Sequence, residues 1–180
     1  TLRVFLVPVT GHVNRPGVVE ITGADGLVSV LDEAGGISST GSMTGILIIG
    51  SYGDTSVVNV ADFLRGGDMS SNPCLSLGDR VHVPEASNYV WIEGALRFTQ
   101  PMSAGFDGAQ DEVAWSGSRR GMTEHIPGET VSELVSRIGG TAPWATRDSC
   151  YIVRTTASGT EARIPVPLDS IGAETVLLPG

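Results

Sequence analysis

An internal repeat constrains the fold of this 180-residue chain more than any other feature of the sequence. Two segments carry apolar residues at the i, i+3, i+4, i+7 spacing of one helix face, and a Gly pair follows each segment. The first runs from Leu27 to Ala34, and the second runs from Val131 to Ile138. Glycine ends a helix without steric strain in the left-handed conformation. The sequence therefore predicts two copies of one module, each with a short helix.

Strand-like segments surround the two predicted helices in a common order. In the first copy, Val9 to Ile21 precedes the helix, a hairpin pattern from Gly45 to Val60 follows it, and Leu75 to Pro84 forms a last strand. The second copy repeats the hairpin from Tyr151 to Ile164 and stops at Gly180. We therefore expect the second copy to lack its last strand.

The order strand, strand, short helix, hairpin, strand describes a helix laid on one small mixed sheet. The fold class expected is α+β, with two tandem β-grasp-like modules, at residues 1–86 and 87–180. Gly and Pro together are numerous, 24 and 10 residues, which favours short strands and tight turns over long helices.

A stretch from about Asp107 to His125 has no counterpart in the first copy by this alignment. Its glycines, its tryptophan and its adjacent arginines are typical of a long surface loop or a protruding hairpin. Loops of more than about 12 to 15 residues are uncommon in compact domains and are usually functional or disordered. We therefore expect this insertion to contact a neighbouring subunit or a polymer.

The candidate ligand-binding residues are Trp115, Arg119 and Arg120 in that insertion. An aromatic ring packs on the C–H face of a pyranose, and planar guanidinium groups donate hydrogen bonds to hydroxyls or carboxylates. Two arginines on an acidic chain also attract anions, which suits acidic sugars or a carboxylate-bearing partner. The alternative is that Trp115 anchors the loop by covering apolar surface.

Two other tryptophans, Trp91 and Trp144, are candidates for the same role. Trp91 alternates with Val90 and Ile92, which favours packing in the core or between the modules over ligand contact. Trp144 follows a Pro close to the end of the second predicted helix, and either role is open for it.

Composition and motifs argue against several function classes. The net charge of −9 argues against nucleic-acid binding. The sequence has no nucleophile elbow, phosphate loop or metal-binding helix motif, so we expect no catalytic residue, no cofactor and no metal. Cys74 and Cys150 lack a second ligand at metal-binding spacing, and the sequence leaves open whether they form a disulfide or two buried thiols.

Three motifs in order resemble one domain family. They are Val-x-Gly-x-Val-x-x-Pro-Gly-Val at Val9 to Val18, Ala-Gly-Gly-Ile at Ala34 to Ile37, and Leu-x-Leu-Gly-Asp-x-Val-x-Val-Pro at Leu75 to Pro84. Together they resemble the soluble ligand-binding β-grasp (SLBB) domain. The resemblance is strong over residues 4–84 and weaker over 89–180, where Pro-Met replaces Pro-Gly and Ile replaces the Ala before the Gly pair.

Domains of this family occur in tandem in bacterial outer-membrane polysaccharide export proteins. The resemblance implies a non-enzymatic periplasmic module of such a protein, acting in channel assembly and polymer contact during capsule or exopolysaccharide export. The implied partners are the polysaccharide, further copies of the full-length protein in a homo-oligomer, and an inner-membrane export partner. The alternative is a stand-alone periplasmic carbohydrate-binding or assembly accessory protein of the same pathway. By itself, the module pair is expected to be a monomer or weak dimer.

Overall fold

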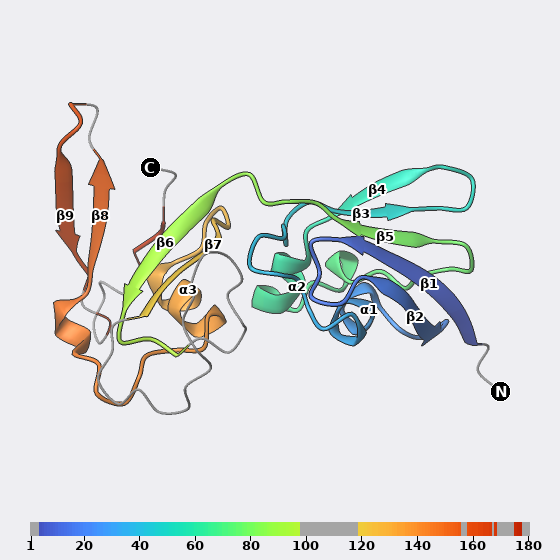
Figure 1. The fold of residues 1–180 in the computed structure, drawn as a ribbon, viewed down its shortest axis with the longest axis horizontal. Coiled ribbons are helices and arrows are strands. Elements are labelled where there is room, and N and C mark those ends of the chain that lie inside the picture. The colour runs from blue at the N-terminus through green and yellow to red at the C-terminus, as the bar shows by residue number, and fades with distance from the viewer. Residues whose placement is uncertain (1–3, 98–118, 156–157, 167, 169–174, 178–180) are drawn as a thin grey trace. The chain divides into compact units, whose positions relative to one another are not determined.

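The computed structural model describes residues 4–97, 119–155, 158–166, 168 and 175–177 (Figure 1). The chain divides into two compact units, Thr1–Tyr89 and Val90–Gly180. Each unit combines short helices with β-strands, so the predicted α+β fold in two modules is confirmed. The division falls just after the predicted boundary between residues 86 and 87.

The first module is built on one five-stranded mixed sheet in the order β2-β1-β5-β3-β4 (Figure 1). Its strands are β1 (Val4–Gly11), β2 (Gly17–Thr22), β3 (Ile46–Ile49), β4 (Thr55–Val58) and β5 (Arg80–Val83). β1 pairs antiparallel with β2 and parallel with β5, and β3 pairs antiparallel with both β4 and β5. The predicted last strand of this module therefore lies at the centre of its sheet.

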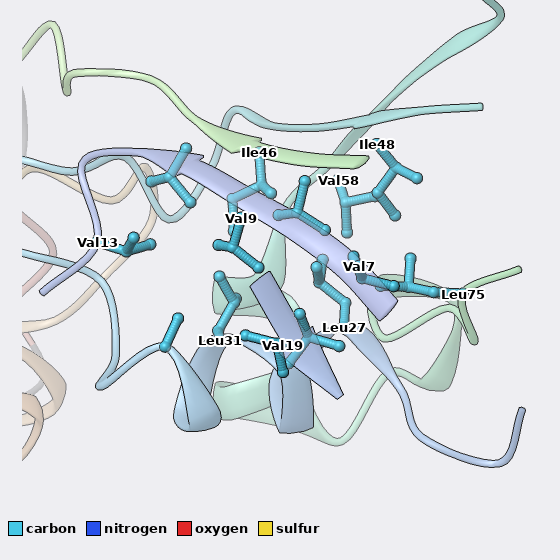
Figure 2. Packing of buried hydrophobic residues seen from close by; sticks show 14 of the residues in the cluster. Val7, Val9, Val13, Val19, Leu27, Leu31, Ile46, Ile48, Val58 and Leu75 are labelled. Carbon is cyan, nitrogen blue, oxygen red and sulfur yellow. The ribbon is translucent and has the colours of Figure 1, made fainter. Parts of the chain in front are cut away.

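Helix α1 (Leu27–Glu33) packs against the five-stranded sheet and completes the core of the first module. Leu27 and Val30 are fully buried, as the apolar spacing predicted. They belong to the same cluster as Val7 and Val9 of β1, and Figure 2 shows side chains of the helix and the strands gathered in one layer. Glycines with positive φ follow the helix and end it, at 77° for Gly35 and 84° for the next residue.

A second helix, α2 (Val60–Gly66), and a 3-10 helix, η1 (Met69–Ser71), follow the β3-β4 hairpin. The sequence predicted one short helix per module and a strand as far as Val60, so both points are corrected for the first module. The physical reason lies at Asn59, whose side-chain oxygen accepts a hydrogen bond from the Ala61 amide and so caps the helix. The strand consequently stops at Val58.

The opposite face of the five-stranded sheet carries exposed aliphatic side chains. Leu6 is 58% exposed although its neighbour Val7 is fully buried, because successive side chains of a strand point to opposite faces. The exposed aliphatic residues of the strands are Val4, Leu6, Val18 and Val57. The same face also carries Thr10, Glu20, Arg80 and His82, so it combines aliphatic with polar side chains.

The second module contains two separate two-stranded sheets and one α-helix within the described residues. Its elements are β6 (Tyr89–Gly94), β7 (Arg119–Glu124), α3 (Val131–Arg137), a 3-10 helix η2 (Arg147–Ser149), β8 (Tyr151–Thr155) and β9 (Glu161–Pro165). β6 pairs with β7, and β8 pairs with β9. The core of this module joins Val131 and Leu134 of α3 to Ile138, Val166 and Leu177. Val90 and Ile92 of β6 and Ile152 of β8 pack against this cluster.

Equivalent backbone hydrogen bonds recur in the two modules. The amide of Leu27 donates to the carbonyl of Pro73 at 3.0 Å, and the amide of Val131 donates to that of Thr175 at 3.0 Å. Both bonds place a late segment of the module beside the start of its helix. β6-β7, α3 and β8-β9 thus correspond to β1-β2, α1 and β3-β4.

β7 corrects the predicted position of the insertion. Its residues, Arg119–Glu124, lie inside the stretch from Asp107 to His125 that the sequence had left without a counterpart. The strand pairs with β6, and it stands between β6 and α3 in the chain where β2 stands between β1 and α1, so it has a counterpart in the first module. The extra residues of the second module therefore fall between the two strands of its first hairpin, and residues 107–118 lie outside the described residues.

Candidate ligand-contact face

The side chains of β6 point alternately into the second core and away from it. Val90 and Ile92 pack against the core cluster. Trp91 and Glu93 therefore lie on the opposite, outer face, and 74% of the Trp91 side chain is exposed. The prediction of core packing for Trp91 is wrong, because the alternation places its two neighbours there instead. Packing between the modules, the other role expected for Trp91, stays a prediction.

Arg120 of β7 adds a charged group to the same face. Its Nε lies 3.0 Å from Oε2 of Glu93, and the two side chains are 64% and 54% exposed. An ion pair this exposed adds at most about 1 kcal/mol to stability. Its consequence is geometric, because it holds one guanidinium and one carboxylate on the strand pair that also carries Trp91. We call Trp91, Glu93 and Arg120 the β6-β7 face.

Only one of the three predicted site residues is placed on this face. Arg120 is there, whereas Trp115 lies outside the described residues. Arg119 opens β7, and only its backbone is described. The sequence favoured packing over ligand contact for Trp91, and it did not indicate Glu93. The signal that identifies them is the phase of the apolar alternation in β6, which puts both on the side away from the core.

The equivalent face of the first module has different chemistry. The amide of Val13 donates to the carbonyl of Gly11 at 3.0 Å, and Leu96 donates in the same way to Gly94 at 3.0 Å. Gly94 therefore corresponds to Gly11. Pro8 and Trp91 each lie three residues before these glycines, so Pro8 of β1 corresponds to Trp91 of β6. Around this position the first module presents aliphatic side chains, Leu6 and Val18, and the second presents an indole and an ion pair.

Trp144 occupies a different setting. It lies in the turn closed by the hydrogen bond from the Ala145 amide to the Ala142 carbonyl, 3.0 Å long, and 49% of its side chain is exposed. It comes from neither β6 nor β7. It therefore offers a natural comparison for Trp91.

The remaining reactive side chains are dispersed. Within the described residues, no three His, Cys, Asp or Glu side chains come together as a metal site would need. Both cysteines are free, with Cys74 exposed and Cys150 partly buried. Burial raises the pKa of the Cys150 thiol, and a backbone hydrogen bond at Tyr151 opposes this shift. None of the described helices has the length and apolar character that a membrane-crossing helix needs.

The fold defines a tandem of two small α+β modules. Comparison with family models identifies them: SLBB domain models match residues 6–83 and residues 121–165. The chain belongs to the SLBB domain family and carries two copies of the domain. No curated protein matches the sequence.

Proposed function

We propose that this chain is a non-enzymatic periplasmic part of an outer-membrane polysaccharide export protein, where it takes part in channel assembly and contacts the polymer. The observation that carries the proposal is the pair of SLBB domains, because such domains are found in polysaccharide export proteins. The exposed Trp91 beside an ion pair supports polymer contact. In the full-length protein, the partners proposed are further copies of itself, an inner-membrane export protein, and a capsular or exocellular polysaccharide.

Deleting both modules from the protein in the bacterium that makes it tests this proposal. Surface polysaccharide should fall to the level of a strain without the protein, while polymer accumulates inside the envelope. An immunoblot must show that the shortened protein is still present in the outer-membrane fraction. Normal surface polysaccharide with the shortened protein present would contradict the proposal.

The second candidate is a stand-alone periplasmic carbohydrate-binding or assembly accessory protein of the same pathway. The exposed Trp91 favours it as much as it favours the exporter, because either protein would contact sugars. Fractionation and chemical cross-linking distinguish the two. An exporter sediments with the outer membrane as a high-order oligomer, and an accessory protein stays in the soluble periplasmic fraction.

A further inference from the structure

We propose that the β6-β7 face, Trp91 with Glu93 and Arg120, is a binding site for an uncharged pyranose unit of the polymer. The inference rests on the proposed function for the presence of a polysaccharide. It goes further by naming the residues, the class of sugar, and which of the two modules binds it.

The exposed indole supplies the apolar half of the site. Trp91 lies on a strand, held from behind by Val90 and Ile92 in the core, yet 74% of its side chain meets solvent. The strand fixes the backbone of Trp91, so only the two side-chain torsions of the indole lose freedom on binding. A flat, apolar face with a polar N–H at its edge fits the C–H face of a sugar ring, whose hydroxyls lie around its rim.

The ion pair supplies the polar half. Arg120 uses Nε toward Oε2 of Glu93, so the other nitrogens of the guanidinium lie on an exposed side chain, as does the second carboxylate oxygen. Neighbouring sugar hydroxyls both donate and accept hydrogen bonds. A carboxylate that accepts, held beside a guanidinium that donates, therefore matches two adjacent hydroxyls.

Charge decides between uncharged and acidic sugars. Glu93 neutralises Arg120 at 3.0 Å, and the whole chain carries a net charge of −9. A uronate carboxylate would have to compete with Glu93 for the guanidinium and would approach an acidic protein. The sequence predicted an anion-attracting patch at Arg119 and Arg120. Because Glu93 neutralises Arg120, Arg120 no longer supports that prediction.

The first module lacks this combination at the equivalent place. Pro8 is the residue of β1 that corresponds to Trp91 of β6. The side chains next to Pro8 on the outer face, Leu6 and Val18, are aliphatic. The chain should consequently bind one sugar segment per copy through this face. A single stacked ring gives weak affinity, and repeated contacts along a polymer raise the apparent affinity.

Affinity gel electrophoresis of the 180-residue chain measures the binding directly. The gels contain dextran, hydroxyethyl cellulose or galactomannan as uncharged polymers, and alginate as a polyuronate. At least one uncharged polymer should retard the chain, and Trp91→Ala should weaken that binding about tenfold or more, which corresponds to about 1.4 kcal/mol. Trp144→Ala is the matched control and should bind as the unaltered chain does.

Two further variants keep the result interpretable. Trp91→Phe retains an aromatic ring and should keep part of the binding. Glu93→Gln combined with Arg120→Gln should weaken binding about threefold or more. Because Trp91, Glu93 and Arg120 are exposed, the thermal midpoints of their variants should match that of the unaltered chain, and circular dichroism must show that Trp144→Ala is folded. Retardation by none of the uncharged polymers, stronger binding to alginate, or equal loss in Trp91→Ala and Trp144→Ala would overturn the inference.

A second experiment separates this inference from the proposed function. Trp91→Ala is introduced into the full-length protein in its bacterium, next to the deletion of both modules. The inference expects reduced export in both strains. Normal export with Trp91→Ala and lost export with the deletion would overturn the inference and leave the proposed function standing. Normal export in both would contradict the proposed function.

Discussion

Arg137 of α3 and Glu129, in the loop before that helix, form two parallel charge-assisted hydrogen bonds. Nε of Arg137 lies 2.7 Å from Oε1 of Glu129, and Nη2 lies 2.8 Å from Oε2. The guanidinium also donates to Oγ1 of Thr123 at 2.6 Å and to the carbonyl of Glu124 at 3.0 Å. Glu129 is only 1% exposed. One arginine therefore ties the helix, its preceding loop and β7 together.

Arg137→Met should destabilise the second module by about 3 kcal/mol, because it leaves a buried carboxylate without its guanidinium partner. Urea unfolding monitored by circular dichroism measures the loss. The matched control is Glu33→Met at the corresponding exposed position of α1, which should change stability by less than about 0.5 kcal/mol. If Arg137→Met and Glu33→Met lower the free energy of unfolding equally, the Arg137–Glu129 pair contributes little to stability.

Gly11→Ala should destabilise the first module by about 3 kcal/mol. Gly11 has a φ of 85°, and a Cβ there would overlap the carbonyl oxygen of Val83 in β5. Gly53→Ala separates these two causes, since Gly53 has a φ of 86° with nothing within 4 Å of its would-be Cβ, and it should lose only about 1 kcal/mol. If Gly11→Ala and Gly53→Ala melt at the same temperature, the close approach of β1 to β5 does not make Gly11→Ala more destabilising.

Leu177→Ala should destabilise the second module by about 3 kcal/mol, because Leu177 is 7% exposed and belongs to the core cluster around α3. Its neighbour Val176 is 42% exposed, so Val176→Ala should lose less than about 1 kcal/mol. Chemical unfolding of both variants makes the comparison. A loss in Val176→Ala that equals the loss in Leu177→Ala would contradict the placement of this segment.

Two free thiols should react with Ellman's reagent in two phases at pH 8. Cys74 is exposed and should react first. Burial raises the pKa of Cys150, so a smaller fraction of it is thiolate, and its phase should be at least about tenfold slower. Raising the pH should speed up the Cys150 phase. Cys74→Ser should leave only the slow phase, and a chain that reacts only after reduction would instead contain a disulfide.

The helices and hairpins that the sequence predicted correctly owe this to local patterns. Helix α1 begins at Leu27 and α3 begins at Val131, as the apolar spacing indicated, and a Gly pair follows each. Both β3-β4 and β8-β9 follow from apolar segments separated by turn residues. Because these signals lie within a few residues of one another, they need no knowledge of the rest of the chain.

The errors have a different origin. Asn59 caps α2 inside what looked like a continuing strand, so a single side-chain hydrogen bond outweighs an alternating pattern. β7 has the sequence Arg-Arg-Gly-Met-Thr-Glu, which carries almost no apolar alternation, and it forms against β6. The alternation in β6 separates Trp91 from Val90 and Ile92, but only the core shows that Trp91 lies on the side away from it, so core packing was the wrong expectation. Pairing partners and burial are long-range properties.

The position of β5 in the first module has a consequence for how the chain folds. β5 is the last strand along the module, yet it lies between β1 and β3, with Val9 opposite Val81 and Thr10 opposite His82. The β1-β2 and β3-β4 hairpins can close early, because their partners are near in sequence. The parallel β1-β5 pair must bridge nearly the whole module, and such distant contacts form slowly. During synthesis the first module should therefore remain open at its centre, with the backbone edges of β1 and β3 unpaired, until Val83 has left the ribosome.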